Sequence, residues 1–238
     1  MIGLIKKVFK SLPIAFTKNQ QYDKQTKSVL KKVCRLQSNC IDVGCHKGEI
    51  LDIFIQYAPL GKHYGFEPIP TLFENLLKKY KGSTSNIYNI ALSNAIGKAT
   101  FNYVVSNPAY SGLIKRKYDN RNEIDQEIMV ETNRLDTIIP LDLPIDVIKI
   151  DVEGGELLVL EGAMQTIKKY KPIIIFEHGK GASEFYDSTP EKVFNFFANC
   201  EMKISTMKNW LHQKPAFTLH EFQYQFNNKV NYYFIAHP

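Results

Sequence analysis

The sequence lacks any run of about 18 apolar residues, the length that a helix needs to cross a bilayer. Repeats and biased tracts are also missing, although hydrophobic residues make up 44% of the 238 positions. Cysteine is scarce, with neither the close pairing of a zinc ribbon nor the density of a secreted disulfide scaffold: Cys34, Cys40, Cys45 and Cys200. We therefore expect a cytoplasmic chain with reduced thiols, no structural metal and a single sizeable core.

Acidic residues are nearly absent from the first 35 positions, where nine Lys and Arg face the single acid Asp23. This stretch carries a charge of +8, so the remainder carries −2 of the net +6. We predict a basic helical arm over residues 1–37 and one domain over residues 38–238, with an insertion or lid around residues 99–135.

Residues 1–16, "MIGLIKKVFKSLPIAF", place apolar side chains near one helical face and lysines on the other. We expect an amphipathic basic helix and not a secretory signal, because lysines interrupt the apolar run and no small-residue cleavage site follows. Packing against the domain is the favoured interpretation. Peripheral contact with anionic lipid at the inner membrane surface and contact with nucleic acid remain open.

Short apolar runs alternate with segments of helical spacing along most of the chain. Parallel strands are predicted at residues 39–44, 63–68, 86–92, 145–151 and 172–179. Helices are predicted at residues 21–36, 48–58, 70–80, 155–170 and 189–200. Strand-like segments at 97–105 and 126–138 indicate a β-rich insertion, and late strands are expected at 202–206 and 232–237. The pattern predicts an α/β, doubly wound, Rossmann-like fold with a mostly parallel sheet and an antiparallel C-terminal strand.

Ligands of such folds bind at the carboxyl ends of the strands. In "DVGCHKG", Gly44 and Gly48 bracket a strand-to-helix turn where backbone N–H groups can approach a ligand. Glu67 follows Gly48 by 19 residues, at the end of the second strand, where an acid can accept two ribose hydroxyl hydrogen bonds. The pair indicates a ligand that contains a nucleoside.

The sequence lacks both G-x-G-x-x-G and G-x-x-x-x-G-K-[ST], so it has no standard cradle for a dinucleotide or a nucleoside triphosphate. It has instead a looser G-x-x-x-G with Asp42 two residues ahead. An acid at this position repels a diphosphate but can hold a cationic amino-acid group. This favours S-adenosylmethionine, which carries an ammonium and a sulfonium.

Five blocks occur in order between about Asn39 and His178, namely "CIDVGCHKGEI", "YGFEPIPTLFENL", "IYNIALSNAIGKATF", "TNRLDTI" and "DVIKIDVEGGELLVLEGAMQTI...KPIIIFEH". In these blocks the chain resembles the FkbM-type S-adenosylmethionine-dependent methyltransferases. The resemblance implies a class I methyltransferase fold and O-methylation of a sugar or polyketide-type hydroxyl. It also implies that Asp151, Glu153 and Glu156 form a family hallmark.

The expected cofactor residues lie at the strand ends and in the glycine turn: Asp42, Gly44, Cys45, His46, Gly48, Glu67, Pro68, Ile90, Ala91 and Asp151. Many class I methyltransferases have an acid after the third strand for the adenine amino group. This chain has Ile90 and Ala91 there, so an apolar wall is expected instead. Cys45 and His46 fill turn positions, and we assign His46 no catalytic role.

A hydroxyl acceptor must lose its proton during methyl transfer, and a carboxylate or histidine at the site can take it. The candidates are Asp151 first, then Glu177 and His178. Asp151, Glu153 and Glu177 are also hard oxygen ligands that suit Mg²⁺, although a metal is not favoured. Glu153 and Glu156 can alternatively serve the turn and the helix start.

The expected acceptor contacts are Glu153, Tyr110, Ser111, Trp210 and His212. "NPAY" superficially resembles the N-P-P-Y of methyltransferases that act on planar nitrogens, but it lies in the insertion and not after the fourth strand. The preferred function is O-methylation of a sugar, glycan or related metabolite. The alternatives are an RNA methyltransferase that uses the basic arm, although nucleic acid is not favoured, and a non-catalytic module that keeps the cofactor pocket.

Overall fold

The computed structural model of the chain describes residues 17–118 and 122–238. The amphipathic helix predicted over residues 1–16 lies outside the described residues. Within the two described ranges, no helix is both long enough and apolar enough to span a membrane.

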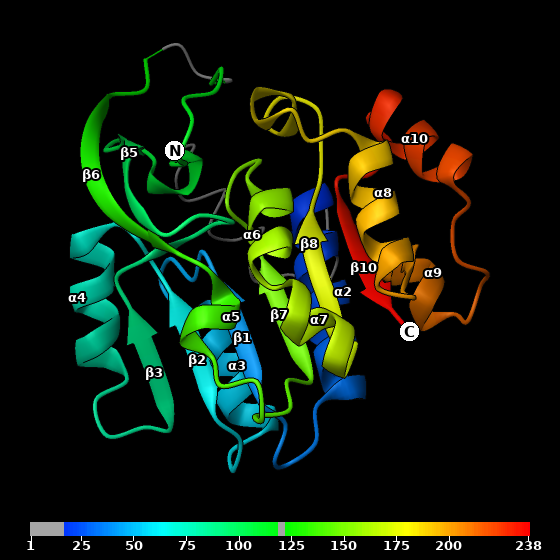
Figure 1. Cartoon of the computed structure of the whole chain (residues 1–238), viewed down its shortest axis with the longest axis horizontal. Coiled ribbons are helices and arrows are strands. Elements are labelled where there is room, and N and C mark those ends of the chain that lie inside the picture. Colours follow the sequence, from blue (N-terminus) through cyan, green and yellow to red (C-terminus); the bar gives the residue numbers. More distant parts are fainter. Residues whose placement is uncertain (1–16, 119–121) are drawn as a thin grey trace, which may run out of the picture.

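One seven-stranded sheet forms the centre of the molecule (Figure 1). Its strands are β1 (Cys40–Val43), β2 (His63–Phe66), β3 (Ser85–Tyr88), β7 (Val147–Ile150), β8 (Ile173–Glu177), β9 (Lys203–Ser205) and β10 (Tyr233–His237). The spatial order is β3-β2-β1-β7-β8-β10-β9, and the first five strands pair in parallel. β10 is antiparallel to both β8 and β9. The predicted mostly parallel sheet with an antiparallel C-terminal strand is confirmed.

Helices cover both faces of this sheet because β1, β7 and β8 are apolar on both sides. One face is covered by α2 (Lys18–Val33), α3 (Glu49–Tyr57), α4 (Pro70–Lys79) and α9 (Met207–Leu211). The other face is covered by α5 (Leu135–Ile138), α6 (Glu156–Gly162), α7 (Met164–Tyr170), α8 (Pro190–Asn199) and α10 (Leu219–Asn227). Alternation along each strand divides the core, so Ile148 packs in one cluster and Val147 in the other.

Helix α2 is part of the domain core and not a separate arm. It begins with a capping box between Thr17 and Gln20. Val29 and Leu30 are fully buried in the same cluster as Phe54 of α3. The prediction placed residues 1–37 in an arm and residues 38–238 in the domain. For α2 this division is wrong, because the helix buries its apolar stripe against the sheet.

The insertion forms a second sheet of β4 (Ala91–Leu92), β5 (Gly97–Val104) and β6 (Asp125–Asn133), in the order β4-β6-β5. β5 and β6 pair antiparallel along their length, and the short 3₁₀ helix Pro108–Tyr110 follows β5. The single strand predicted at 86–92 is split between the two sheets. The Asn89 amide donates to the carbonyls of Glu67 and Pro68, both at 2.9 Å, and so holds the chain at the break.

Three further predictions about secondary structure are wrong. Residues 135–138 form α5 and do not continue a strand, because Asp136 turns to accept hydrogen bonds from the N–H groups of Gln165 and Thr166. The helix predicted at 155–170 breaks at Ala163 into α6 and α7. Helices α9 and α10 fill the tail between its two strands, where only the strands were predicted.

Candidate active site

The carboxyl ends of β1, β2, β7 and β8 border one cavity of about 980 Å³. The strand order reverses between β1 and β7, which is where open α/β sheets bind their ligands. Most of the predicted site residues line this cavity: Asp42, Gly44, Cys45, His46, Glu67, Pro68, Ile90, Ala91, Tyr110, Ser111, Asp151, Glu153 and Glu177. The cavity has a β1–β2 side and a β7–β10 side, which differ in their chemistry.

Gly44 lets the end of β1 approach the end of β7 more closely than any side chain would permit. Its φ is +76°, and a Cβ at this position would lie 2.0 Å from the carbonyl oxygen of Asp151. The N–H groups of Gly44 and Cys45 donate to the carbonyl of Phe66 at 3.0 and 3.1 Å, so the turn is also tied to β2. The glycine therefore joins three strand ends at the floor of the cavity.

Gly48 caps the start of α3 and does not line the cavity. Its φ is +77°, and a Cβ would meet the Tyr80 hydroxyl at 2.3 Å. That hydroxyl donates to the Gly48 carbonyl at 2.7 Å. Gly48 thus shapes the turn from outside, and the predicted direct role in cofactor binding becomes a supporting one.

Glu67 ties the end of β2 to two turns of the β1–β2 side. Its Oε2 accepts the N–H of His46 at 2.8 Å, and its Oε1 accepts the N–H of Ile69 at 2.9 Å. The side chain is 3% exposed, and burial raises its pKa to about 7 against the opposing effect of these two hydrogen bonds. A carboxylate oxygen accepts more than one hydrogen bond, so both oxygens retain capacity for ligand hydroxyls.

Asp42 stands behind the glycine turn with only 2% of its surface exposed. Burial raises its pKa to about 7, and the Lys149 charge opposes that rise only in part. A buried carboxylate is stabilised when a cation lies beside it. Asp42 therefore suits a ligand that brings a positive charge to the β1–β2 side.

Three carboxylates meet on the β7–β10 side. Oxygens of Asp151, Glu153 and Glu177 all lie within 4.8 Å of one another. Glu153 has a left-handed backbone with φ of +57°, and Arg116 of the insertion forms an ion pair with it. The Arg116 guanidinium also lies over the Tyr110 ring, 4.5 Å from its centroid. The insertion is thereby connected to the carboxylate cluster.

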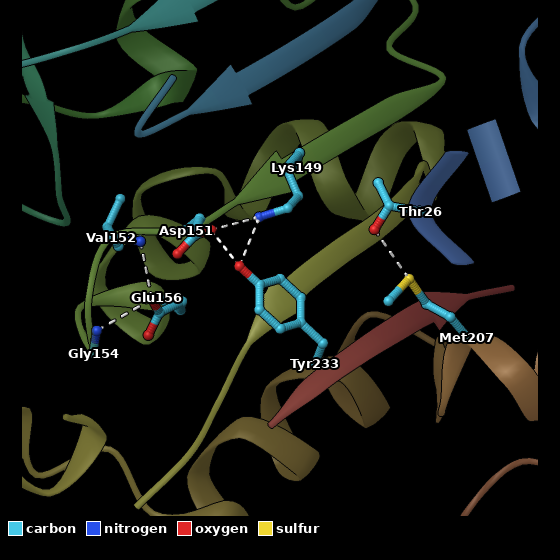
Figure 2. Close-up of polar contacts among 8 residues, drawn as sticks. All are labelled: Thr26, Lys149, Asp151, Val152, Gly154, Glu156, Met207 and Tyr233. Carbon is cyan, nitrogen blue, oxygen red and sulfur yellow. Dashed lines mark hydrogen bonds and ion pairs between the residues drawn. The ribbon is translucent and has the colours of Figure 1, made fainter. Parts of the chain in front are cut away.

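A buried lysine and a tyrosine converge on Asp151 (Figure 2). Lys149 Nζ lies 3.1 Å from Asp151 Oδ2, and the Tyr233 hydroxyl donates to the same oxygen. Lys149 also lies over the Tyr233 ring, 4.7 Å from the centroid. Tyr233 reaches this position because antiparallel β10 starts where β8 ends, which pairs Tyr233 with Glu177.

The pKa values of Asp151 and Glu177 are shifted in opposite directions. Burial disfavours the Asp151 carboxylate, but the Lys149 charge and hydrogen bonds from Tyr233 and Glu177 overcome this, so its pKa lies below the ordinary value. Burial and the Asp151 charge raise the pKa of Glu177 far above its ordinary value. Of the two carboxyl groups, Asp151 is therefore the one that loses its proton more readily.

Glu156 serves the turn and not the cavity. Its Oε1 accepts the N–H groups of Val152 and Gly154 at 3.0 and 3.2 Å, just ahead of α6 (Figure 2). Gly154 has φ of +109°, and a Cβ there would lie 2.7 Å from the Ala182 backbone. The sequence "EGGE" is thus a tight turn whose second acid satisfies backbone donors, while its first acid, Glu153, enters the cavity.

Residues 42–204 match the family model of the methyltransferase FkbM domain. This range covers more than half of the chain and contains the glycine turn, Glu67 and the carboxylate cluster. The chain belongs to the FkbM methyltransferase family. The predicted family is confirmed.

One solved structure supports the class I methyltransferase fold of this family member. An FkbM methyltransferase from Methylobacillus flagellatus KT is 18% identical with a TM-score of 0.50, and the alignment covers 71% of this chain and 39% of that one. This chain thus spans about two fifths of that protein. A putative rRNA methylase from Clostridium thermocellum is 14% identical with a TM-score of 0.46, covering 90% and 92% of the two chains. No curated protein sequence matched significantly.

The residues of the β1–β2 side fit S-adenosylmethionine. Glu67 offers carboxylate oxygens for the ribose hydroxyls, and Asp42 offers a buried negative charge for the cationic methionine part. Ile90 and Ala91 form the apolar wall expected near the base. The cavity volume is also sufficient for a cofactor together with part of an acceptor.

A divalent metal is not required to balance the carboxylate cluster, although its three acids are of the kind that Mg²⁺ binds. Asp151 is paired with Lys149, and Glu153 is paired with Arg116. Burial and the Asp151 charge raise the pKa of Glu177 well above its ordinary value, so this acid takes up a proton readily. Two basic side chains and proton uptake therefore reduce the negative charge of the cluster.

The structure does not bring His178, Trp210 or His212 to the cavity, so these three site predictions are corrected. His178 follows Glu177 on β8 and points to the opposite face, where it is fully buried and stacks on Phe226 at 4.8 Å. Burial lowers its pKa to about 4, so its ring is neutral. Trp210 and His212 belong to the α9 region under α2, where Lys32 covers the Trp210 ring.

Lys149, Tyr233, Arg116 and Tyr22 line the cavity but were absent from the predicted site. Lys149 carried a usable signal, because a lysine inside a buried apolar strand needs a partner. The other three carried no local pattern. They reach the cavity through the insertion, the antiparallel strand β10 and helix α2, at positions that all lie outside the motif blocks.

Proposed function

We propose that this FkbM methyltransferase transfers the methyl group of S-adenosylmethionine to a hydroxyl oxygen of a sugar, glycan or related metabolite. One observation carries the proposal: the ionised carboxylate of Asp151 borders the same cavity as the cofactor residues Gly44 and Glu67. An alcohol is methylated only if a nearby group takes its proton. Asp151 is the acceptor of that proton.

The residues of the site align the reactants and receive the proton. S-adenosylmethionine, when bound, supplies a methyl group on a sulfonium whose positive charge disappears on transfer. Lys149 and Tyr233 fix the Asp151 carboxylate at the cavity wall, and Glu177 supports it as a hydrogen-bond donor. Tyr110 and Ser111 of the insertion line the opposite part of the cavity and limit the access of water.

The acid content of the cavity favours an uncharged acceptor over RNA. Among the described lining residues, eight are acids and three are cations. The acids are Asp23, Asp42, Glu49, Asp52, Glu67, Asp151, Glu153 and Glu177, and the cations are Lys27, Arg116 and Lys149. Such a lining repels phosphate groups. The nine basic residues of the first 35 positions are the observation that favours an RNA acceptor. Total RNA is therefore one of the acceptors in the donor assay.

We propose that the enzyme lies in the cytoplasm and that residues 1–16 contact anionic lipid at the inner membrane surface. A membrane position would bring the cavity to lipid-linked glycans. Binding of the full chain to vesicles with 30% anionic lipid, compared with neutral vesicles, tests this part separately.

A donor assay tests the function. The full chain is incubated with methyl-labelled S-adenosylmethionine and, in separate reactions, methyl glycosides, nucleotide sugars, short glycans and total RNA. We expect label in a glycoside or glycan as a methyl ether, which resists mild alkali, whereas a methyl ester would be hydrolysed. Label that appears in RNA alone, or that is lost in alkali, would overturn the proposal.

A further inference from the structure

Helix α2 turns a polar stripe toward the cavity at its N-terminal half. Its cavity residues recur at intervals of three and four: Asn19, Tyr22, Asp23, Thr26 and Lys27. This spacing places them on one face of a helix. The apolar residues Val29 and Leu30 follow in the C-terminal half and pack in the core. The N-terminal half of the helix therefore borders the cavity, with Tyr22 shared between the cavity and the core.

The opposite end of the chain completes this wall. Tyr232 and Tyr233 line the cavity where β10 begins, and both pack on Tyr22, with ring centroids 4.8 and 5.2 Å away. The Tyr232 hydroxyl donates to the Asn19 side chain. Lys18 Nζ donates to the carbonyl of Val230 at 3.0 Å, which fixes α2 to the segment before β10. We call Asn19, Tyr22, Asp23, Thr26, Lys27, Tyr232 and Tyr233 the α2–β10 wall.

The α2–β10 wall lies beside the reacting carboxylate and away from the cofactor residues. Tyr233 bonds directly to Asp151, whereas Asp42, Gly44 and Glu67 belong to β1 and β2 on the other side of β7. With the cofactor on the β1–β2 side, the space against the α2–β10 wall is the part of the cavity that an acceptor can reach.

The chemistry of the wall suits an uncharged sugar ring. Tyrosine rings offer apolar faces to C–H groups, while Asn19 and Asp23 offer hydrogen-bond partners for hydroxyls. Each described cation of the cavity has an acid close to it: Lys149 has Asp151, Arg116 has Glu153, and Lys27 stands one helical turn from Asp23. The cations are thereby compensated, and none is left to recognise a phosphate.

We infer that the acceptor of this enzyme is an uncharged saccharide ring bound against the α2–β10 wall, so that both ends of the described chain form the acceptor site. The inference rests on the proposed function, which it deepens by placing the acceptor and naming its class. Tyr232 is the residue best suited to a test, because it is half-buried and belongs to the wall without contacting Asp151.

Saturation-transfer NMR on the full chain with S-adenosylhomocysteine tests the inference without turnover. The probes are the methyl glycosides of mannose, galactose, glucose and rhamnose, with galactose 1-phosphate as the charged comparison. We expect at least one glycoside to bind, Tyr232→Ala to weaken it about tenfold, and Tyr232→Phe to retain it within about threefold, because the ring provides the contact. Tyr224→Ala is the matched control, since Tyr224 is 54% exposed on α10 outside the cavity.

Asn19→Ala provides a second variant that leaves the aromatic packing intact, and we expect it to weaken the same glycoside about threefold through one lost hydrogen bond. Glycoside binding that is unchanged in both Tyr232→Ala and Asn19→Ala would overturn the inference. The inference would also be overturned if the enzyme bound galactose 1-phosphate but none of the glycosides. It would equally be overturned if no probe bound while calorimetry showed normal binding of S-adenosylhomocysteine. If the wild-type chain does not bind S-adenosylhomocysteine at all, the proposed function itself is contradicted.

Discussion

The two sides of the cavity are built from the chain in different ways. The β1–β2 side comes from three short segments, residues 42–46, 67–69 and 90–91, in which the motif and the site coincide. The β7–β10 side gathers α2, the insertion, β7, β8 and the start of β10, which are spread over the whole chain. The first side therefore depends on neighbouring residues, whereas the second depends on contacts between segments that are distant in the sequence.

The two sides also handle negative charge differently. On the β1–β2 side, Asp42 and Glu67 are buried and not ion-paired, so burial raises the pKa of each to about 7. On the β7–β10 side, Lys149 and Arg116 contact Asp151 and Glu153 directly. The β7–β10 side thus has basic partners of its own, although burial and the Asp151 charge still raise the pKa of Glu153 to about 8. Asp42 and Glu67 on the β1–β2 side have no ion-pair partner among the described residues.

The largest effect that separates the two sides is expected from Asp151→Asn. Removing the proton acceptor should lower the rate of methyl transfer by about 10²- to 10⁴-fold, whereas cofactor affinity should change less than about threefold. Single-turnover kinetics with an acceptor from the donor assay measures the first, and calorimetry measures the second. If Asp151→Asn transfers the methyl group at the wild-type rate, Asp151 is not the proton acceptor.

Gly44→Ala should disrupt the junction of both sides. Its Cβ would overlap the Asp151 carbonyl oxygen, so we expect the free energy of unfolding to fall by about 3 kcal/mol or more, or cofactor binding to be lost. Gly82→Ala is the matched control, because Gly82 has a similar φ of +80° but no atom within 4 Å of the added Cβ. Denaturant unfolding should show a cost of only about 1 kcal/mol there. If both variants lose the same free energy of unfolding, backbone strain alone, and not the close contact with Asp151, explains the need for glycine at position 44.

Glu67→Gln should affect the β1–β2 side alone. The substitution removes the charge and turns an amide group toward a backbone N–H, so we expect cofactor affinity to fall about 10- to 100-fold. Glu74→Gln, an exposed acid on α4, is the control for the change in charge. Calorimetric titration with S-adenosylmethionine measures both. An unchanged affinity in Glu67→Gln would contradict the assignment of the ribose acid.

The smallest effect concerns pH and the stability of the cofactor-free protein. The pKa values of Asp42, Glu67 and Glu156 are raised to about 7, so the folded state binds more protons than the unfolded state above about pH 4.5. The contribution of these three groups to stability is therefore greatest below that pH and is lost as the pH rises through 7. We expect Tm to fall by about 5 °C between pH 5 and 8.

Two comparisons sharpen the pH prediction. S-adenosylmethionine should offset the fall in Tm, because it binds only the folded state and supplies positive charge beside the carboxylates. Glu67→Gln should show a shallower fall, since one of the shifted groups is gone. Differential scanning calorimetry across this pH range measures each case, and a Tm that rises with pH in the cofactor-free protein would show that these carboxylates are not buried as described.

Much of the fold and half of the site were predictable from local patterns. The G-x-x-x-G turn, Glu67 and the apolar strands gave the parallel sheet and the cofactor residues, because alternation and glycine geometry act over a few residues. His178 was misassigned because adjacent strand residues face opposite sides, and the choice of side depends on which helix covers which face. Trp210 was misassigned because helix α9 was not recognised in the tail.

The sequence alone determined the parallel strands, the glycine turn after the first of them and the acid at the end of the fourth, since each depends on neighbouring residues. Only the tertiary structure decided what surrounds that acid. Lys149, Tyr233 and Arg116 reach the carboxylate cluster from β7, β10 and the insertion. Their meeting depends on the antiparallel pairing of β10 with β8 and on the packing of α2 over the strand ends, which are long-range contacts that no local spacing encodes.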